Sequence, residues 1–112
     1  MSNRDDSAFL DDIKEAARRI AVYTDDLDYE AFLNDFRTQD AVVRNLEIIG
    51  EATKNISEEL KGRYPLIPWK GLAGVRDKLI HHYFGVNFDI VWNIINDELP
   101  QIIVQLEEIP NN

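Results

Sequence analysis

The sequence predicts an all-α protein, an antiparallel bundle of four to five helices. Apolar residues recur three and four positions apart along most of the 112 residues, which is the spacing of one face of a helix. No stretch of strand length alternates between apolar and polar residues. No repeat or linker divides the chain, so we expect a single domain over residues 1–112, which is close to the commonest domain size.

The first two predicted helices lie in the N-terminal third of the chain. A regular apolar face runs over residues 8–23. The polar stretch 24–28 ends this helix. A shorter second helix follows, with one aromatic face made by Tyr29, Phe32 and Phe36.

A long third helix is expected to begin after Thr38 and to continue to about Asn55. The threonine hydroxyl can accept a hydrogen bond from a free amide of the first turn. Gly50 lies inside this helix, where glycine costs about 1 kcal/mol relative to alanine, and the close approach of a neighbouring backbone is the simplest reason for it. Residues 57–68 hold two prolines and a glycine and predict a short helical turn followed by an irregular connection.

Two further helices complete the predicted bundle. Pro68 opens the fourth, because proline suits a first turn, and Gly85 is expected to end it. Asn87 can cap the fifth. Pro100 interrupts that helix by removing one backbone hydrogen bond, so a kink or a new start is expected near Asp97.

The composition narrows the classes of function and location. The chain has no cysteine, which excludes disulfides, thiolate metal sites and a catalytic thiol. No run of about 18 apolar residues is present, and the N-terminus lacks the apolar core of a signal peptide. We therefore expect a cytoplasmic protein that has no membrane partner.

Charge is unevenly distributed along the chain. Twelve Lys and Arg stand against 21 Asp and Glu, a formal net charge of -9, which repels nucleic acid at long range. The stretch 70–78 is an exception, because Lys70, Arg76 and Lys78 face the single anion Asp77 there. If the protein binds a polyanion such as nucleic acid, its acidic residues must lie away from this stretch, or a basic partner must cover them.

The two histidines are the remaining source of acid–base chemistry. His81 and His82 are adjacent, and neighbouring positions on a helix point about 100° apart, so they cannot bind one metal ion together. We expect no metal site. Phosphate-binding glycine loops, dinucleotide-binding glycine patterns and serine elbows are missing from the sequence.

Arg76, Asp77 and His81 form the candidate catalytic set. Asp77 and His81 are four apart on one helix face, where the carboxylate could hold the imidazole in one tautomer. The forked guanidinium of Arg76 suits a phosphodiester oxygen. Arg76 and His81 are five apart and point about 140° away from each other on a regular helix. Either the helix is distorted near Gly85, or a two-fold axis brings both residues of two chains into one cleft, and we favour this dimer.

Simpler interpretations stand beside the functional ones. An isolated Arg-Asp-x-x-x-His stretch is more often a set of surface ion pairs. Glu47, Glu51 and Lys78 are candidates to line the cleft, although the two glutamates could equally form a solvated pair, and Arg44 could pair with Glu47 on the helix surface. The remaining aromatic and histidine candidates have structural alternatives too: Tyr83 as a core residue, His82 as a structural or solvent-facing residue, Trp92 as a core anchor, and Trp69 as a core anchor or a stacking surface for a base.

Three stretches resemble the HEPN toxins that are encoded beside a minimal nucleotidyltransferase antitoxin. They are RNLEIIGEA at 44–52, IPWKGLAGVRDKLIHHY at 67–83 and VNFDIVW at 86–92. The defining motif of that family is Arg, four to six residues, His, one residue and Tyr, and it matches Arg76, His81 and Tyr83.

The resemblance implies a homodimeric HEPN-like helical bundle that cuts RNA without a metal or another cofactor. The 2′-hydroxyl would attack the adjacent phosphate, while His81 moves protons, Arg76 binds the phosphate and Asp77 orients the histidine. Tyr83 would be modified with AMP by the cognate antitoxin, which neutralises the toxin. The resemblance implies neither a DNA substrate nor a membrane partner.

Two positions differ from the usual pattern, and two other functions remain open. His82 occupies the variable position of the motif and could replace a lost His81, while Asn87 stands where aspartate is frequent. The same dimer could instead be a non-catalytic nucleotide-binding or docking subunit of a nucleotidyltransferase complex, which the acidic net charge favours. A purely structural helical dimer is the third alternative.

Overall fold

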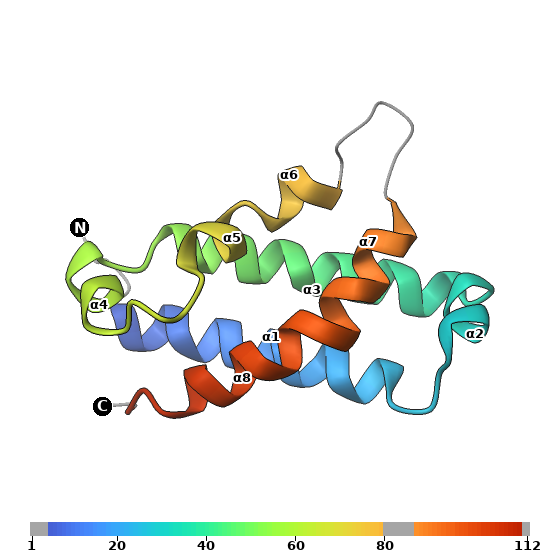
Figure 1. Cartoon of the computed structure of the whole chain (residues 1–112), viewed down its shortest axis with the longest axis horizontal. Coiled ribbons are helices and arrows are strands. Elements are labelled where there is room, and N and C mark those ends of the chain that lie inside the picture. The colour runs from blue at the N-terminus through green and yellow to red at the C-terminus, as the bar shows by residue number, and fades with distance from the viewer. Residues whose placement is uncertain (1–4, 80–86, 111–112) are drawn as a thin grey trace.

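The computed structural model describes residues 5–79 and 87–110 (Figure 1). These residues form helices and their connections, so the predicted all-α fold is confirmed. The helices are α1 (Asp6–Thr24), α2 (Tyr29–Leu33), α3 (Phe36–Lys54), α4 (Glu58–Arg63), α5 (Trp69–Ala73), α6 (Val75–Leu79), α7 (Phe88–Asn93), the π-helix η1 (Ile94–Glu98) and α8 (Leu99–Glu107).

The two longest helices form the centre of the bundle. α1 and α3 pack antiparallel along their lengths, α5 and α6 lie against α3, and the C-terminal segment α7–η1–α8 crosses in front of both long helices (Figure 1). Every helix contributes apolar side chains to one buried cluster. No helix in the described part of the chain is long and apolar enough to span a bilayer.

The start of α3 differs from the prediction, whereas the start of α7 agrees with it. α3 is capped by Asp35, not by Thr38: one Asp35 carboxylate oxygen accepts from the Thr38 amide at 3.0 Å and the other from the Thr38 hydroxyl at 2.8 Å. Phe36 therefore begins α3, with 74% of its surface exposed, and does not extend the aromatic face of α2. Asn87 does cap α7, because its side-chain oxygen accepts from two amides of the first turn at 3.0 and 3.2 Å.

The predicted fourth helix is interrupted at Gly74, which separates α5 from α6. This interruption lies against Gly50 of α3, as expected for a glycine in a helix interior. A Cβ atom on Gly50 would meet a Val75 methyl group at 3.3 Å and the Leu72 carbonyl oxygen at 3.4 Å. The expected close approach of a neighbouring backbone is confirmed. The predicted helix end at Gly85 lies outside the described residues.

The predicted irregularity before Pro100 is confirmed as the π-helix η1. Pro100 has no amide hydrogen to donate to the carbonyl four residues earlier. The Leu99 amide instead donates to the Ile94 carbonyl, five residues back, and α8 starts at Leu99. The π-turn inserts one extra residue into each turn, which changes the side chains that this segment presents to α3 and α5.

Candidate functional site

Arg76 is placed on α6, where its side chain contacts α3. The guanidinium Nε donates to a carboxylate oxygen of Glu47 at 3.4 Å. The arginine side chain remains 60% exposed and the glutamate 30% exposed. Arg76 is thus paired with one carboxylate, and most of its N–H donors remain accessible to a ligand.

The close approach of α5 and α6 to α3 explains how two residues 29 positions apart come together. Gly50 lies less than one turn after Glu47 on α3, and its missing side chain admits the backbone at the end of α5, just before α6 begins. The sequence suggested that Glu47 could pair with Arg44 on its own helix. The structure pairs it with Arg76 across two helices instead.

The other predicted site residues divide into two groups. Asp77 and Lys78 lie exposed on α6, and Glu51 lies exposed on α3, one turn after Glu47. Lys78 also lines a pocket between α3, α6 and η1. The predictions for His81, His82 and Tyr83 concern residues outside the described part of the chain.

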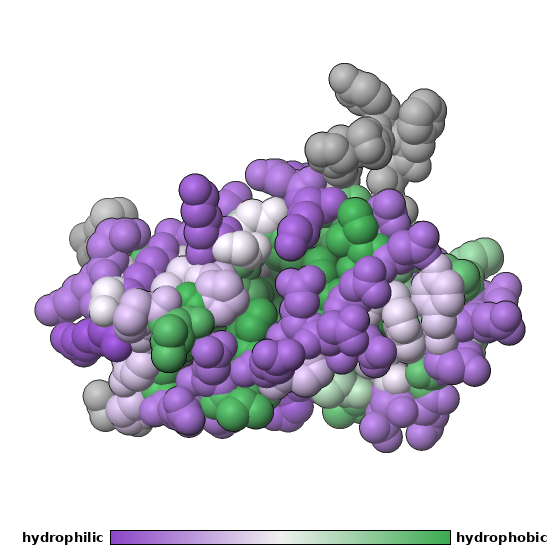
Figure 2. All heavy atoms as spheres, viewed as in Figure 1, coloured by the Kyte–Doolittle hydropathy of each residue, from purple (hydrophilic) through white to green (hydrophobic). Residues whose placement is uncertain are grey.

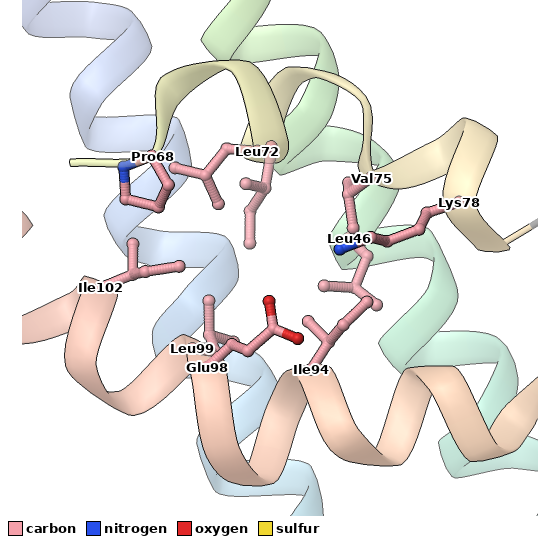
Figure 3. A pocket seen from close by; sticks show the side chains of 11 residues that line it. Leu46, Pro68, Leu72, Val75, Lys78, Ile94, Glu98, Leu99 and Ile102 are labelled. Carbon is pink, nitrogen blue, oxygen red and sulfur yellow. The ribbon is translucent and has the colours of Figure 1, made fainter.

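A pocket opens between α3, α5–α6 and η1–α8 (Figure 3). Hydrophobic residues are exposed at the surface between these elements (Figure 2). Two charged side chains reach the pocket from opposite sides, Lys78 from α6 and Glu98 from η1. Aliphatic side chains form most of its lining, namely Leu46, Ile49, Leu72, Val75, Ile94, Leu99 and Ile102.

Glu98 is not among the site residues that the sequence predicts. A signal was available, because Glu98 lies four residues from both Ile94 and Ile102, on a stripe that is otherwise apolar. A charged residue on an apolar helix stripe indicates either an unusual packing environment or a functional position.

Trp69 and Trp92 act as packing residues. The Trp69 ring is 7% exposed and its Nε1 donates to the Tyr64 carbonyl at 3.0 Å, so the ring offers no free face for stacking a base. Trp92 is half-buried and its ring centroid lies 5.3 Å from that of Phe32. The prediction of two core anchors is confirmed for Trp69, and Trp92 packs at the edge of the core.

The described residues contain no group of three or more His, Asp or Glu side chains that could hold a metal ion. Exposed cations on α5 and α6, Lys70, Arg76 and Lys78, form a local basic stretch in an acidic chain.

Comparison with known proteins gives one consistent family. A family model described as "Ribonuclease HepT-like" matches residues 13–109. "Putative RNase MJ0127" of Methanocaldococcus jannaschii is 50% identical over 109 residues, which are 97% of this chain and 90% of that protein. "Probable ribonuclease HepT" of Thermococcus cleftensis is 45% identical over 101 residues, 90% of this chain and 92% of that protein.

One relative has a different length. "Gamma-glutamylcyclotransferase and putative RNase MJ0434" of Methanocaldococcus jannaschii is 38% identical over an alignment of 113 positions, gaps included, which covers 97% of this chain but 51% of that protein. No solved structure gives a significant match. The family match covers most of the chain and agrees with the all-helical fold, so the chain belongs to the HepT-like ribonuclease family.

Proposed function

We propose that this protein is a metal-independent endoribonuclease, the toxin of a toxin–antitoxin pair, with Arg76 and His81 as its catalytic residues. Membership of the HepT-like ribonuclease family carries this proposal. The exposed guanidinium of Arg76, anchored by Glu47, supports it.

Arg76 binds the scissile phosphate. Its side chain is 60% exposed and contacts Glu47 through Nε, so the two terminal nitrogens can donate to the non-bridging phosphate oxygens. Negative charge grows on those oxygens as the fifth oxygen adds to phosphorus. A fixed cation at that point lowers the energy of the transition state more than that of the bound RNA.

His81 moves the protons of the reaction. The neutral imidazole accepts the proton of the 2′-hydroxyl as that oxygen attacks the adjacent phosphorus. The bond from phosphorus to the 5′-oxygen breaks, and a proton returned to this oxygen gives a 5′-hydroxyl and a 2′,3′-cyclic phosphate. Asp77 is the residue that orients His81, because a spacing of four positions would suit a contact on one helix face.

The net charge of -9 is compatible with an RNA substrate because of where the cations lie. Lys70, Arg76 and Lys78 are exposed on α5 and α6. Screening at physiological ionic strength confines exposed charges to a range of about 8 Å, so RNA at this stretch interacts mainly with its local cations.

A homodimer through the α5–α6 region would complete the site. If the helix continued regularly to His81, Arg76 and His81 would point about 140° apart, and one chain would not direct both at the same phosphate. A two-fold axis brings the arginine of one protomer to the histidine of its partner. We propose this composite cleft as the active site.

Control by an antitoxin is the last part of the proposal. A nucleotidyltransferase encoded with this protein would transfer AMP from ATP to the Tyr83 hydroxyl and release pyrophosphate. Tyr83 is two residues from His81, so the added phosphate would repel RNA at the site of cleavage. The pair would act in the cytoplasm.

The deciding experiment is cleavage of RNA in EDTA by protein shown by mass to carry no AMP. Wild type, Arg76→Ala, His81→Ala and the double variant His81→Ala with His82→Ala are compared, because His82 could replace its neighbour. We expect 2′,3′-cyclic phosphate ends and a loss of roughly a hundredfold or more when His81 is removed.

No cleavage by the AMP-free wild type, or cleavage that EDTA abolishes, would overturn the proposal. The net charge of -9 favours the second candidate, a non-catalytic nucleotide-binding or docking subunit of a nucleotidyltransferase complex. Binding of the transferase by an RNA-inactive protein would establish that role.

A further inference from the structure

Arg44 is a charged residue that the proposed catalytic set does not use. It is exposed on α3, three residues before Glu47. That spacing suits a surface ion pair, but the Glu47 carboxylate pairs with Arg76 instead. Arg44 forms no ion pair with any other described residue, although Asp40 lies four residues before it. Its guanidinium group is therefore available to a ligand.

The position of Arg44 relative to Arg76 follows from the packing of α6 on α3. Val75, the first residue of α6, lies against Gly50, and the next residue, Arg76, contacts Glu47. α6 therefore runs antiparallel to α3, as Figure 1 shows. Arg44 is the next exposed residue of α3 in the direction in which α6 runs.

The two arginines lie close together because both are near Glu47. Residues three apart on a helix have Cβ atoms about 5–6 Å from each other. Helical side chains lean toward the N-terminus, so the Glu47 carboxylate lies over the turn that carries Arg44. The Arg76 Nε atom is 3.4 Å from this carboxylate. The Arg76 guanidinium is thus about one helical turn from Arg44, which is close to the separation of neighbouring phosphates in single-stranded RNA.

We propose that Arg44 forms a second phosphate subsite, which binds the phosphate next to the scissile one. This inference rests on the proposed function, which places the scissile phosphate on Arg76. The Arg44 guanidinium donates two parallel N–H bonds to the non-bridging oxygens of the neighbouring phosphodiester. That phosphate does not react, so the contact is equally strong in bound RNA and in the transition state. Arg44 therefore raises the affinity for RNA and leaves the chemical step unchanged.

The charges near Arg44 limit the subsite to one phosphate. A strand that continued past Arg44 along α3 would meet Asp40, which is exposed about one turn away. Its carboxylate repels a further phosphate. An exposed ion pair between Asp40 and Arg44 would contribute little, so a phosphate held through two charge-assisted hydrogen bonds competes with it. We expect one additional phosphate, and not a longer track, to depend on Arg44.

The first test measures binding and does not need cleavage. A short 2′-O-methyl RNA, which has no attacking hydroxyl, is titrated at several salt concentrations, and binding is followed by fluorescence anisotropy. Arg44→Gln should weaken binding about five- to tenfold and reduce the slope of log Kd against log salt by about 0.7, the value for one phosphate on a single strand. Arg44→Lys keeps the charge and should keep the slope.

Arg63→Gln is the matched control for this test. Arg63 is also an exposed arginine, but it lies on α4, at the opposite end of the bundle from the start of α3 (Figure 1). This variant should bind with the affinity and the salt slope of wild type. Equal salt slopes for wild type and Arg44→Gln overturn the inference.

The second test locates the phosphate that Arg44 binds. A 2′-O-methyl RNA with a single ribose has one 2′-hydroxyl, which fixes the scissile phosphate. A neutral methylphosphonate then replaces the neighbouring phosphate on either side in turn. One of the two replacements should raise the wild-type KM about five- to tenfold, with kcat within about twofold. The same replacement should have no effect in Arg44→Gln, and a neutral linkage one position further out should have none in wild type.

Two results of the second test overturn the inference. One is a wild-type KM that depends on neither neighbouring phosphate. The other is an Arg44→Gln variant with a lower kcat and an unchanged KM, which would place Arg44 on the scissile phosphate itself. Unchanged thermal unfolding of Arg44→Gln separates a lost contact from a lost fold.

The inference and the proposed function fail in different ways. Cleavage of RNA with a salt slope that does not depend on Arg44 leaves the ribonuclease and overturns the phosphate subsite. A salt slope that Arg44→Gln reduces, in a protein that cleaves no RNA, keeps the subsite and overturns the ribonuclease.

Discussion

At the scale of single residues, the contact between Glu47 and Arg76 is the feature closest to the proposed chemistry. The 3.4 Å hydrogen bond from the arginine Nε fixes one edge of a guanidinium that is otherwise exposed. An exposed ion pair adds little to stability, so its effect is expected in the orientation of the side chain. Glu47 is thus a positioning residue that acts through Arg76.

Replacing Glu47 should therefore change the rate more than the binding of RNA. In Glu47→Ala we expect kcat to fall about tenfold, the effect of roughly one hydrogen bond, with KM within about twofold of wild type. Glu47→Gln keeps an acceptor for Nε and should retain most of kcat. Glu51→Gln, one turn further along α3, is the control. A lower KM in Glu47→Ala would show that the glutamate masks the arginine and does not position it.

Gly50 provides a stability test with an internal comparison. A Cβ atom there would contact Val75 at 3.3 Å and the Leu72 carbonyl at 3.4 Å, whereas a Cβ atom on Gly62 of α4 meets nothing within 4 Å. Gly62→Ala should raise the free energy of unfolding by about 0.5–1 kcal/mol, the usual helix gain. Gly50→Val should lower it by about 1–3 kcal/mol through overpacking. Urea unfolding measures both, and an equal gain at the two glycines would contradict the close packing of α3 against α6.

These residues also show the limit of sequence reasoning. The need for glycine at position 50 could be predicted, because helix propensity is a local property. The partner of Glu47 could not, because Arg44 satisfies the same spacing rule on the same helix and Arg76 is 29 positions away. Only the packing of α6 on α3 decides between the two arginines.

At the scale of secondary structure, most of the errors lie at helix ends, and the break at Gly74 is an error inside a predicted helix. The periodic stretches of α1, α3 and α7–α8 predicted helices where the structure has them. Asp35 and Thr38 are both good cap residues three positions apart, and the sequence prediction named Thr38 alone. Asp35 is the cap because its carboxylate accepts hydrogen bonds from both the amide and the hydroxyl of Thr38.

The cap on α3 should be sensitive to acid. The Thr38 amide, followed by its hydroxyl, lowers the pKa of Asp35 below its ordinary value of 3.8. A carboxylate whose pKa is lower in the folded state stabilises the fold above its unfolded pKa, and loses this effect as the pH falls through the folded value. Asp35→Ala should therefore have a lower Tm than wild type at pH 7, and the difference should shrink below pH 3.8.

Asp35→Asn separates the charge from the hydrogen bond. Its amide oxygen can still accept from Thr38 but does not titrate, so its Tm relative to Asp35→Ala should not change over the same pH range. Thermal unfolding followed by circular dichroism gives all three values. A gap between wild type and Asp35→Ala that stays constant into acid would show that the carboxylate is not the group responsible.

At the scale of the whole molecule, the distribution of charge decides how an acidic protein can act on RNA. The net charge is -9, yet α5 and α6 expose Lys70, Arg76 and Lys78 and also border the apolar pocket. The composition predicted that the chain repels RNA at long range, and the stretch 70–78 predicted where the local cations lie. The pocket beside it depended on the π-turn and on three separated segments, which no local pattern specifies.

The composite cleft can be tested by mixing two inactive variants. If Arg76 of one protomer works with His81 of its partner, Arg76→Ala and His81→Ala dimers that exchange subunits form mixed dimers with one intact pair. Random exchange makes about half of the dimers mixed, each with one of two sites intact, so activity should recover to roughly a quarter of wild type. Each variant alone should stay inactive, and sedimentation should show dimers in every sample. If both residues act within one chain, every site in the mixture keeps one missing residue and activity stays at the level of the separate variants, which would place the cleft inside a single protomer.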